Sequence, residues 1–559
     1  MLLRLSIVIA LVAATFTCSA QFIQKTNETF SRADTLRGML RPERTCFDVK
    51  HYSINLELFI KEKSISGFVE MKFEALTDFK KMQIDLYPNM LIDSIVYKAT
   101  NCNYTREFGA VFIDLPNIKK SAIDSIRVYY HGVPKIAKNA PWDGGFVWSQ
   151  DNNKNPWIGV ACEAEGASLW WPCKDHPSDE PDSVSFTMTV PYSMTCVSNG
   201  QLVQKIAHGD TRNTFEWKVT NPINLYNISF YVGDYYLIDG EYIDFKDRKL
   251  SKKYWVIGKK FFVAKLHFKQ VDGMLHAYEQ YFGPFPFFDD GYSLVEAPYL
   301  GMEHQSGIAY GNNYNSGYLG GRIPADQKFD YIVIHESAHE YWGNSVSADD
   351  RADMWIHESF ATYCEALYVE WINNYQKAVE YLLYQKPGIS NRSPIVGPRD
   401  VAYDGWKDSD MYIKGSWMLH SLRNTVNDDQ LWFKYLRALY DHFKISVTNT
   451  TEIVKFTNDY FKKDYTPFFS QFLMFNTLPV LEYYVENKGS GILLYYRWKS
   501  DEEHFNMPQK IGNGTDLWRI FPETKWKRTI FKNITKENFN IDESSFLMQL
   551  RKLEVKPKI

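Results

Sequence analysis

One short stretch, HESAHEYWGNSVSADDRADMWIHESF, residues 335–360, predicts two helices that lie against each other. On a helix His335 and His339 lie four residues apart and share one face. Apolar residues precede them at helical intervals, and Gly343 is placed to end this first helix. A second helix is predicted from Asp353, its expected cap, and carries Glu358. The eighteen residues between His339 and Glu358 leave room for a loop and a returning helix.

These two helices predict a metal site. Two imidazoles at this spacing can both reach one zinc ion at about 2.0–2.1 Å, and a glutamate from the second helix completes a His₂Glu set. That set leaves one coordination position open, as in catalytic zinc sites. We therefore expect one zinc ion per chain, held by His335, His339 and Glu358. The competing interpretation, two surface histidines on an ordinary helix, is disfavoured by the buried-looking helix around them.

Two glutamates near the predicted ligands have other roles. Glu336 follows the first ligand and points away from the ligand line, so it is the predicted general base that acts on zinc-activated water. Glu365 lies seven residues after Glu358, on the same face of the second helix. It either accepts a hydrogen bond from one zinc histidine and fixes its tautomer, or is a solvated glutamate, and both interpretations stay open. His357 points elsewhere and has no predicted role.

The chain of 559 residues is long enough for about three domains. Residues 43–237 alternate apolar and polar positions between turns, which predicts an N-terminal β-domain. Helical spacing dominates residues 238–476, and a last strand-like region, 477–559, is short enough for a small β-sandwich. Residues 21–42 form a polar N-terminal extension. The predicted fold class is therefore multidomain α+β.

Targeting and composition limit the cellular setting. Residues 1–20 have a basic start, an apolar run and a small-residue exit, which predicts a signal peptide cut after Ala20 and a secreted or periplasmic protein. A lipid anchor at Cys18 is the weaker alternative. No apolar run reaches the length of a membrane span, and a net charge of −4 gives no case for nucleic acid. Six further cysteines would allow one or two disulfides in an oxidising compartment.

At this point the sequence resembles the gluzincin aminopeptidases, the family of aminopeptidase N and the leukotriene hydrolase. HESAHEYWGN followed by WIHESFATY is similar to the zinc signature of that family, and APYLGMEHQSG, residues 297–307, to its second motif. YFGPFPF and WWPCKDHPSDEPDS also match, in family order. The resemblance runs from about residue 45 to 475. It implies an N-terminal β-domain, a thermolysin-like catalytic domain and a C-terminal β-domain.

The resemblance also implies how the substrate amine is held. The glutamate of the second motif, here Glu303, binds the free α-amine, and pairing a carboxylate with that ammonium leaves only the first peptide bond over the zinc. A helper residue ten positions before Cys173 corresponds to Glu163, with Glu165 as its rival. His304 stands where the family commonly has Asn, which leaves the shape of the adjoining subsite open.

Two tyrosines enter through the resemblance. Tyr412, in a Tyr-x-Lys-Gly context, corresponds to the family tyrosine whose hydroxyl faces the developing oxyanion. Tyr299, four residues before Glu303, is expected to wall the pocket for the first side chain.

The predicted function is a zinc aminopeptidase that acts on peptides with a free N-terminus. The alternatives are a thermolysin-like endopeptidase, without the amine anchor, and a non-catalytic binding protein on a peptidase scaffold. The large helical C-terminal domain of many relatives is not expected here, so the site is either more open or covered by a partner subunit. A homo-oligomer is therefore left open.

Overall fold

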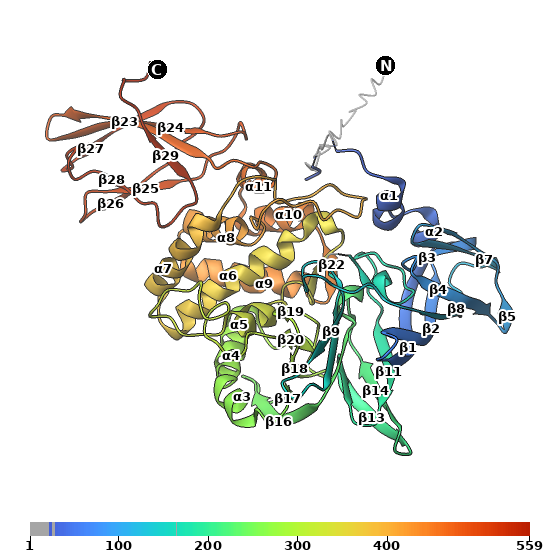
Figure 1. Ribbon diagram of the computed structural model, residues 1–559. Coiled ribbons are helices and arrows are strands. Elements are labelled where there is room, and N and C mark those ends of the chain that lie inside the picture. The colour runs from blue at the N-terminus through green and yellow to red at the C-terminus, as the bar shows by residue number, and fades with distance from the viewer. Residues whose placement is uncertain (1–21, 25–27, 164, 559) are drawn as a thin grey trace, which may run out of the picture.

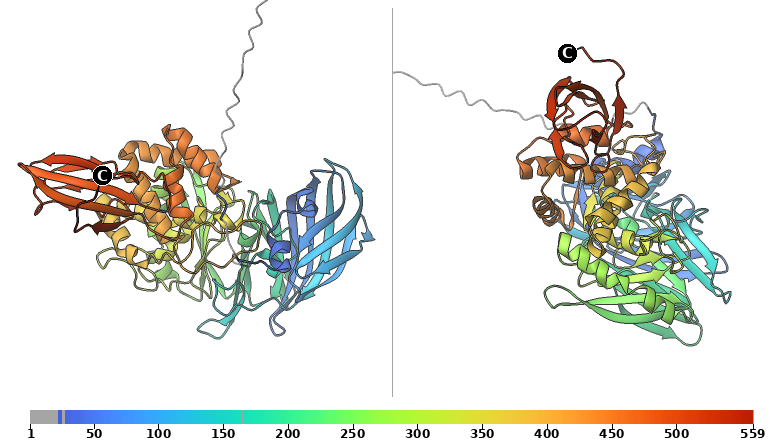
Figure 2. Two further views of the ribbon diagram at one scale, coloured as in Figure 1. Left: turned by 90° about the horizontal axis from the view of Figure 1, so that it is seen from above. Right: turned by 90° about the vertical axis from the view of Figure 1, so that its left-hand side faces the viewer.

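The computed structural model describes residues 22–24, 28–163 and 165–558. It has an N-terminal part built from β-sheets, a helical middle with one small sheet, and a C-terminal part of two sheets (Figure 1). The N-terminal and C-terminal sheets lie at opposite ends of the molecule, with the helical part between them (Figure 2). The predicted multidomain α+β class is confirmed. The predicted signal peptide lies outside the described residues.

The N-terminal part is held together by an eight-stranded sheet. Its inner strands alternate buried and partly exposed residues, as β1 does over most of its length, so one face packs on the core. The core below it contains the adjacent Trp170 and Trp171, both fully buried. The strand order is β13 (Gln201–His208), β14 (Arg212–Val219), β11 (Ser183–Pro191), β1 (Phe47–Phe59), β2 (Ser64–Ala75), β8 (Ile123–Gly132), β4 (Met90–Tyr97), β5 (Thr100–Asn101).

Two smaller sheets complete this part. One has the order β12 (Thr195–Ser198), β15 (Phe230–Gly233), β10 (Pro156–Ala161), β9 (Gly145–Gln150). The other has the order β3 (Phe79–Asp85), β7 (Ala110–Ile118), β6 (Tyr104–Glu107). Two short helices precede β1: α1 (Arg32–Gly38) lies in the predicted N-terminal extension, and α2 (Pro42–Thr45) begins at its last residue.

The middle part contains a five-stranded sheet of order β16 (Tyr235–Ile243), β17 (Lys249–Ile257), β18 (Tyr292–Glu296), β20 (Ile308–Tyr310), β19 (Gly301–Met302). Since β16 pairs with β17, the predicted boundary at 237 falls inside a strand of this sheet. The helices are α3 (Phe261–His267), α4 (Gln270–Phe282), α5 (Tyr331–Ala338), α6 (Trp355–Ile372), α7 (Tyr375–Gln385), α8 (Ile413–Val426), α9 (Asp429–Phe443), α10 (Thr450–Phe461), α11 (Thr466–Leu473).

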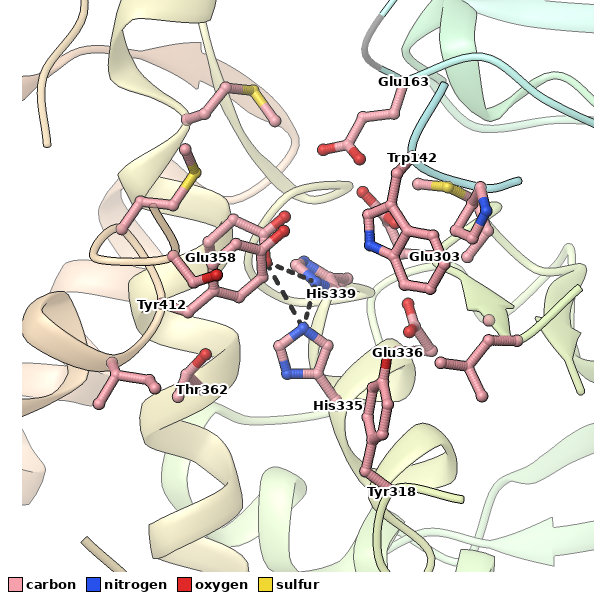
Figure 3. A pocket seen from close by; sticks show the side chains of 18 of the residues that line it. Trp142, Glu163, Glu303, Tyr318, His335, Glu336, His339, Glu358, Thr362 and Tyr412 are labelled. Atoms are coloured by element: carbon pink, nitrogen blue, oxygen red, sulfur yellow. Dashed lines mark hydrogen bonds and ion pairs between the residues drawn. The ribbon is translucent and has the colours of Figure 1, made fainter. Parts of the chain in front are cut away.

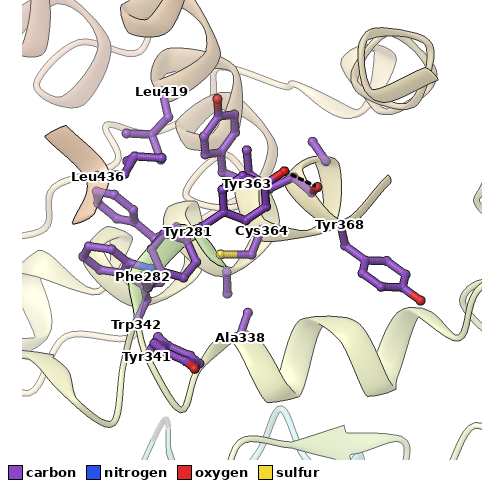
Figure 4. Close-up of a cluster of buried hydrophobic side chains, with 14 of the residues drawn as sticks. Tyr281, Phe282, Ala338, Tyr341, Trp342, Tyr363, Cys364, Tyr368, Leu419 and Leu436 are labelled. Carbon is purple, nitrogen blue, oxygen red and sulfur yellow. Dashed lines mark hydrogen bonds between the residues drawn. The ribbon is translucent and has the colours of Figure 1, made fainter. Parts of the chain in front are cut away.

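A large aromatic cluster fixes the helices against one another. Trp342, just after α5, stacks on Phe360 of α6 with ring centroids 4.1 Å apart, and both side chains are buried. Ala338 at the end of α5 and Cys364 on α6 belong to the same cluster (Figure 4). Burying one large apolar side chain contributes about 1.5–3 kcal/mol, so this cluster sets the geometry of α5 against α6.

The C-terminal part has two sheets with a small apolar core between them. One has the order β27 (Lys527–Lys532), β24 (Gly491–Lys499), β23 (Val480–Lys488), β29 (Gln549–Lys552), and the other β26 (Leu517–Ile520), β25 (Gln509–Gly512), β28 (Asn540–Ile541). A last pair, β21 (Val346–Ala348) and β22 (Ser446–Thr448), lies in the middle part. Within the described ranges, no helix combines the length and apolarity that a membrane crossing requires. The six described cysteines are all unpaired.

Candidate metal centre and substrate cavity

A cavity of about 800 Å³ lies where the N-terminal and helical parts meet. The N-terminal part contributes Trp142 and Glu163 to its wall. The helical part contributes the residues around Glu303, the inward face of α5 and α6, and a segment that ends at Tyr412. Figure 3 shows these side chains converging on the same space from separate segments.

Helix α5 supplies two imidazoles to the floor of this cavity. Its first turn is capped by Asp330, whose carboxylate accepts hydrogen bonds from the backbone N–H groups of Ile332 and Val333. The four-residue spacing then places the Nε2 atoms of His335 and His339 3.3 Å apart. Both side chains are almost fully buried.

Helix α6 brings a carboxylate to the same point. Oε2 of Glu358 lies 3.5 Å from Nε2 of His335 and 3.6 Å from Nε2 of His339. Tetrahedral ligands at about 2.0–2.2 Å from zinc lie roughly 3.3–3.6 Å from one another. The same Oε2 is buried and has no hydrogen-bond partner, which is costly for a carboxylate unless a cation binds it. The three residues therefore fit a zinc ion.

The outer nitrogens of both histidines are already engaged. Nδ1 of His335 lies 2.7 Å from Oε1 of Glu365, and Nδ1 of His339 lies 2.9 Å from the carbonyl oxygen of Trp342. Because those acceptors require a proton on Nδ1, each Nε2 presents a lone pair to the shared point. Glu365 is fully buried, and its other oxygen accepts from the hydroxyl of Tyr381. The solvated interpretation of Glu365 is therefore wrong.

Three further carboxyl groups surround the predicted metal point. Carboxylate oxygens of Glu303 and Glu336 lie within 4.8 Å of a nitrogen of His339, and those of Glu163 and Glu303 lie within 4.8 Å of Glu358. Burial and the neighbouring carboxylates raise the pKa of Glu163 to about 8 and that of Glu303 well above its usual range. Burial raises the pKa of Glu336 to about 7. A cation bound in this cavity would favour the ionised form of these three carboxyl groups and so lower their pKa values.

Tyr412 reaches the cavity because α8 packs closely on α6. A Cβ atom on Gly415 would lie 1.8 Å from Oγ of Ser359, so only glycine permits this approach. The hydroxyl of Ser359 also donates to the carbonyl of Met411, one residue before Tyr412. The Tyr412 ring stacks on His335 with centroids 6.1 Å apart. Burial raises the pKa of Tyr412 far above its usual range, so its hydroxyl stays protonated and is a donor.

The structure separates two residues that the sequence left as rivals. Glu163 lines the cavity, whereas Glu165 is engaged outside it by the hydroxyl of Tyr87, 3.0 Å away, and by the ammonium of Lys135. His304 also does not line the cavity. Its ring is fully buried, with Nδ1 2.6 Å from the hydroxyl of Tyr231.

Two expectations are corrected. Tyr299 does not wall the cavity: its hydroxyl donates to the carbonyl of Val160, and its ring packs in the core of the N-terminal part. Asp353 does not cap α6, which begins after Met354. Its carboxylate instead accepts a hydrogen bond from the hydroxyl of Thr450 and pairs with Arg399. The first turn of α6 has no side-chain cap, and both oxygens of Asp353 serve these other partners.

Sequence reasoning missed the residues that hold Glu303. The hydroxyl of Tyr226 donates to Oε1 of Glu303 over 2.9 Å, and the side-chain amide of Asn344 donates to its backbone carbonyl over 2.8 Å. His357 lies beside them, 3.4 Å from the Tyr226 hydroxyl, and accepts from the N–H of Ala348. Because Asn344 follows His339 closely in the sequence, its place near the site could have been predicted. Tyr226 offered no such signal.

Comparison with known proteins agrees with the family resemblance that the sequence motifs indicated. Residues 48–226 match the Peptidase M1 N-terminal domain and residues 268–472 the Peptidase family M1 domain. Leukotriene A-4 hydrolase from Xenopus laevis is 23% identical over 75% of this chain and 69% of its own length. Aminopeptidase M1-B from Oryza sativa is 24% identical over 50% of this chain and 32% of its own, so the chain spans about a third of that relative.

A solved structure shares the fold. The crystal structure of an M1 zinc metallopeptidase variant from Deinococcus radiodurans, bound to a Tyr-Ser-Ala substrate, superposes with a TM-score of 0.66. It is 19% identical and covers 79% of this chain and 98% of its own.

Proposed function

Because the chain belongs to peptidase family M1, we propose that it is a zinc aminopeptidase that hydrolyses the first peptide bond of peptides with a free N-terminus. One observation carries this proposal: Glu163 and Glu303 bring carboxylates within 4.8 Å of Glu358, in the same cavity as the histidine cluster. A substrate ammonium bound between Glu163 and Glu303 places its first carbonyl beside that cluster.

Zinc is the metal that the donor set fits. His335, His339 and Glu358 would hold it, and the orphaned oxygen of Glu358 is the atom that most needs it. Zinc at this position supplies Lewis-acid activation of the attacking water and of the substrate carbonyl. Glu358 would bind it as a carboxylate, and the two histidines as neutral imidazoles.

The remaining residues handle protons and charge. Glu336 takes the proton of the attacking water and later delivers it to the leaving amine. The neutral hydroxyl of Tyr412 donates a hydrogen bond to the oxygen that becomes negative in the transition state. Tyr226 and Asn344 keep Glu303 in place for the substrate ammonium.

The names of relatives support this reading without fixing the substrate. The rice relative is named an aminopeptidase, and the Deinococcus radiodurans structure holds a tripeptide. The preferred first residue of this chain is left open by these names.

The test compares one peptide with its N-acetylated form. The purified chain with zinc should cleave the free peptide at its first bond and lose at least about a hundredfold in kcat/KM on the acetylated one, because ammonium pairing is a charge-assisted interaction. Equal cleavage of both would instead identify an endopeptidase. No cleavage of either, with zinc bound, would leave the binding-protein alternative.

A variant assigns the base. Glu336→Gln should retain zinc, measured by elemental analysis, and lose activity by about 10²–10⁴-fold. Near-normal turnover by this variant would contradict the assignment.

We also propose that the protein is secreted or periplasmic, on the strength of the signal-like residues 1–20. Expression in a secretory host followed by N-terminal sequencing tests this. A mature chain that starts at Gln21 is expected, and an intact start at Met1 in the cytosol would contradict it.

A further inference from the structure

A segment before the first strand spans the two walls of the cavity. We call residues 30–38, which comprise Phe30, Ser31 and α1, the N-terminal strap. It precedes both regions that match the family, the first of which begins at residue 48. The helix of the strap starts with a capping box, in which Ser31 and Asp34 each bond the backbone of the other. Figure 1 shows α1 between the N-terminal sheets and the helical part.

The strap is anchored firmly on the N-terminal part. Its Leu36 is fully buried, and the carbonyl of Leu36 accepts a hydrogen bond from the amide of Gln83 over 2.9 Å. The carbonyl of Gly38 bonds Nε2 of His176 over 3.2 Å. Arg44 on α2 donates to the carbonyl of Arg37 and forms a buried ion pair with Asp85. These contacts make the strap a fixed part of the fold.

Arg37 connects the strap to the loop that carries Glu163. Its guanidinium donates to the backbone carbonyl of Glu165, two residues after Glu163, and lies 5.3 Å from the ring centre of Tyr87. Tyr87 in turn donates to the carboxylate of Glu165. One strap side chain therefore holds the loop from which Glu163 enters the cavity.

The other side of the strap holds a second wall. The N–H of Ala402 donates to the carbonyl of Asp34 over 3.1 Å, and the rings of Phe30 and Tyr403 make an edge contact with centroids 6.3 Å apart. A Cβ on Gly38 would lie 2.0 Å from the backbone carbon of Val401. The next residues, Tyr403 and Asp404, line the cavity. The segment from 401 to 404 thus takes its position from the strap.

We infer that the N-terminal strap is a positioning element of the substrate cavity: Arg37 sets the loop that carries Glu163, and Gly38 with Asp34 sets the segment that carries Tyr403. The strap contacts no reacting atom. It acts on how the first residue of the substrate is held, and so on KM more than on kcat. Its kinetic consequence rests on the proposed aminopeptidase function, whereas its structural consequence does not.

The kinetic test compares Arg37→Gln with Arg32→Gln, a matched change on the same helix. Arg32 forms only an exposed pair with Glu107. With an aminoacyl 4-nitroanilide, Arg37→Gln should raise KM about three- to tenfold and leave kcat within about twofold, because one hydrogen bond to the loop is lost. Arg37→Lys should restore most of the affinity, and Arg32→Gln should match the wild type. Equal KM values for the two glutamine variants would overturn the inference.

The second test needs no activity and follows hydrogen–deuterium exchange. Arg37→Gln should speed exchange in the peptide around residues 163–168, and Gly38→Ala should do so around residues 401–404. The control for the glycine change is Gly273→Ala on α4, where an added Cβ meets nothing within 4 Å. Unchanged exchange in both segments overturns the inference even if the wild type cleaves peptides. Altered exchange in a chain that cleaves nothing sustains the strap and rejects the proposed function.

Discussion

Nδ1 of His335 and Oε1 of Glu365 lie 2.7 Å apart, and this contact decides which nitrogen of His335 faces the cavity. The second oxygen of Glu365 accepts from Tyr381 and from the amide of Gln385. In a glutamine at this position, the oxygen would have to face those two donors, because an amide nitrogen cannot accept a hydrogen bond. The amide nitrogen would then face the N–H at Nδ1 of His335, which needs an acceptor. Glu365→Gln should therefore disturb the orientation of His335 and weaken zinc binding about 10–100-fold.

A chelator competition that measures the zinc dissociation constant checks this. Glu370→Gln is the control, because Glu370 lies on the same helix but pairs with Arg423. If both variants bind zinc as tightly as the wild type, Glu365 does not orient His335.

Tyr226 is expected to serve substrate binding through Glu303. Tyr226→Phe removes the hydroxyl that donates to Oε1 of Glu303. Loss of one such hydrogen bond should raise KM about three- to tenfold with little change in kcat. Steady-state kinetics on an aminoacyl anilide measure this, with Tyr440→Phe, which loses only a contact to Ser345, as the control. A fall in kcat at constant KM would argue against this role.

The pH dependence of kcat/KM should be bell-shaped. Burial raises the pKa of Glu336 to about 7 from its usual 4.5, and a base must be deprotonated, so activity is lost as pH falls through that pKa. A zinc ion nearby favours the carboxylate and moves this acid limb below 7. The alkaline limb follows the substrate α-amino group, whose pKa is about 7.7–8.0.

Two substrates with different α-amino pKa values separate the limbs. Only the alkaline limb should move with the substrate. An acid limb that moves as well would mean that Glu336 does not control it.

The sequence predicted what depends on local spacing and missed what depends on distant contacts. His335 and His339 share a helix face because they are four residues apart, and the apolar alternation revealed the N-terminal sheets. The bond from Tyr226 to Glu303 joins residues 77 positions apart, so no local pattern announces it. Tyr299 was misplaced because its hydroxyl has a partner, Val160, in another part of the chain.

The N-terminal strap shows the same limit. Residues 21–42 read as a polar extension, yet Leu36 is fully buried and Arg37 reaches Glu165, 128 positions away. The polar composition hid this role because the contacts are made mainly by the Arg37 side chain and by backbone carbonyl groups. The segment is ordered mainly by hydrogen bonds, with Arg44 of α2 and its ion pair to Asp85 behind it, and these contacts leave no periodic apolar signal.

The ion pair between Arg44 and Asp85, which lies behind the N-terminal strap, is expected to contribute strongly to the folding stability of the protein. Nη2 of Arg44 lies 2.5 Å from Oδ2 of Asp85, and both side chains are at most 1% exposed. Burial raises the pKa of Asp85 despite Arg44 beside it, so keeping it charged depends on this partner. Asp85→Ala leaves the arginine buried and unpaired, which should lower the free energy of unfolding by about 3–5 kcal/mol.

Urea denaturation followed by tryptophan fluorescence measures this loss, since Trp170 and Trp171 lie in the core of the same part. Asp114→Ala, which breaks the exposed pair with Lys81, should cost at most about 1 kcal/mol. Adding Arg44→Met to Asp85→Ala should recover part of the loss, because the unpaired charge is then gone. If the double variant is no more stable than Asp85→Ala alone, the cost lies in packing around Asp85 rather than in the uncompensated charge of Arg44.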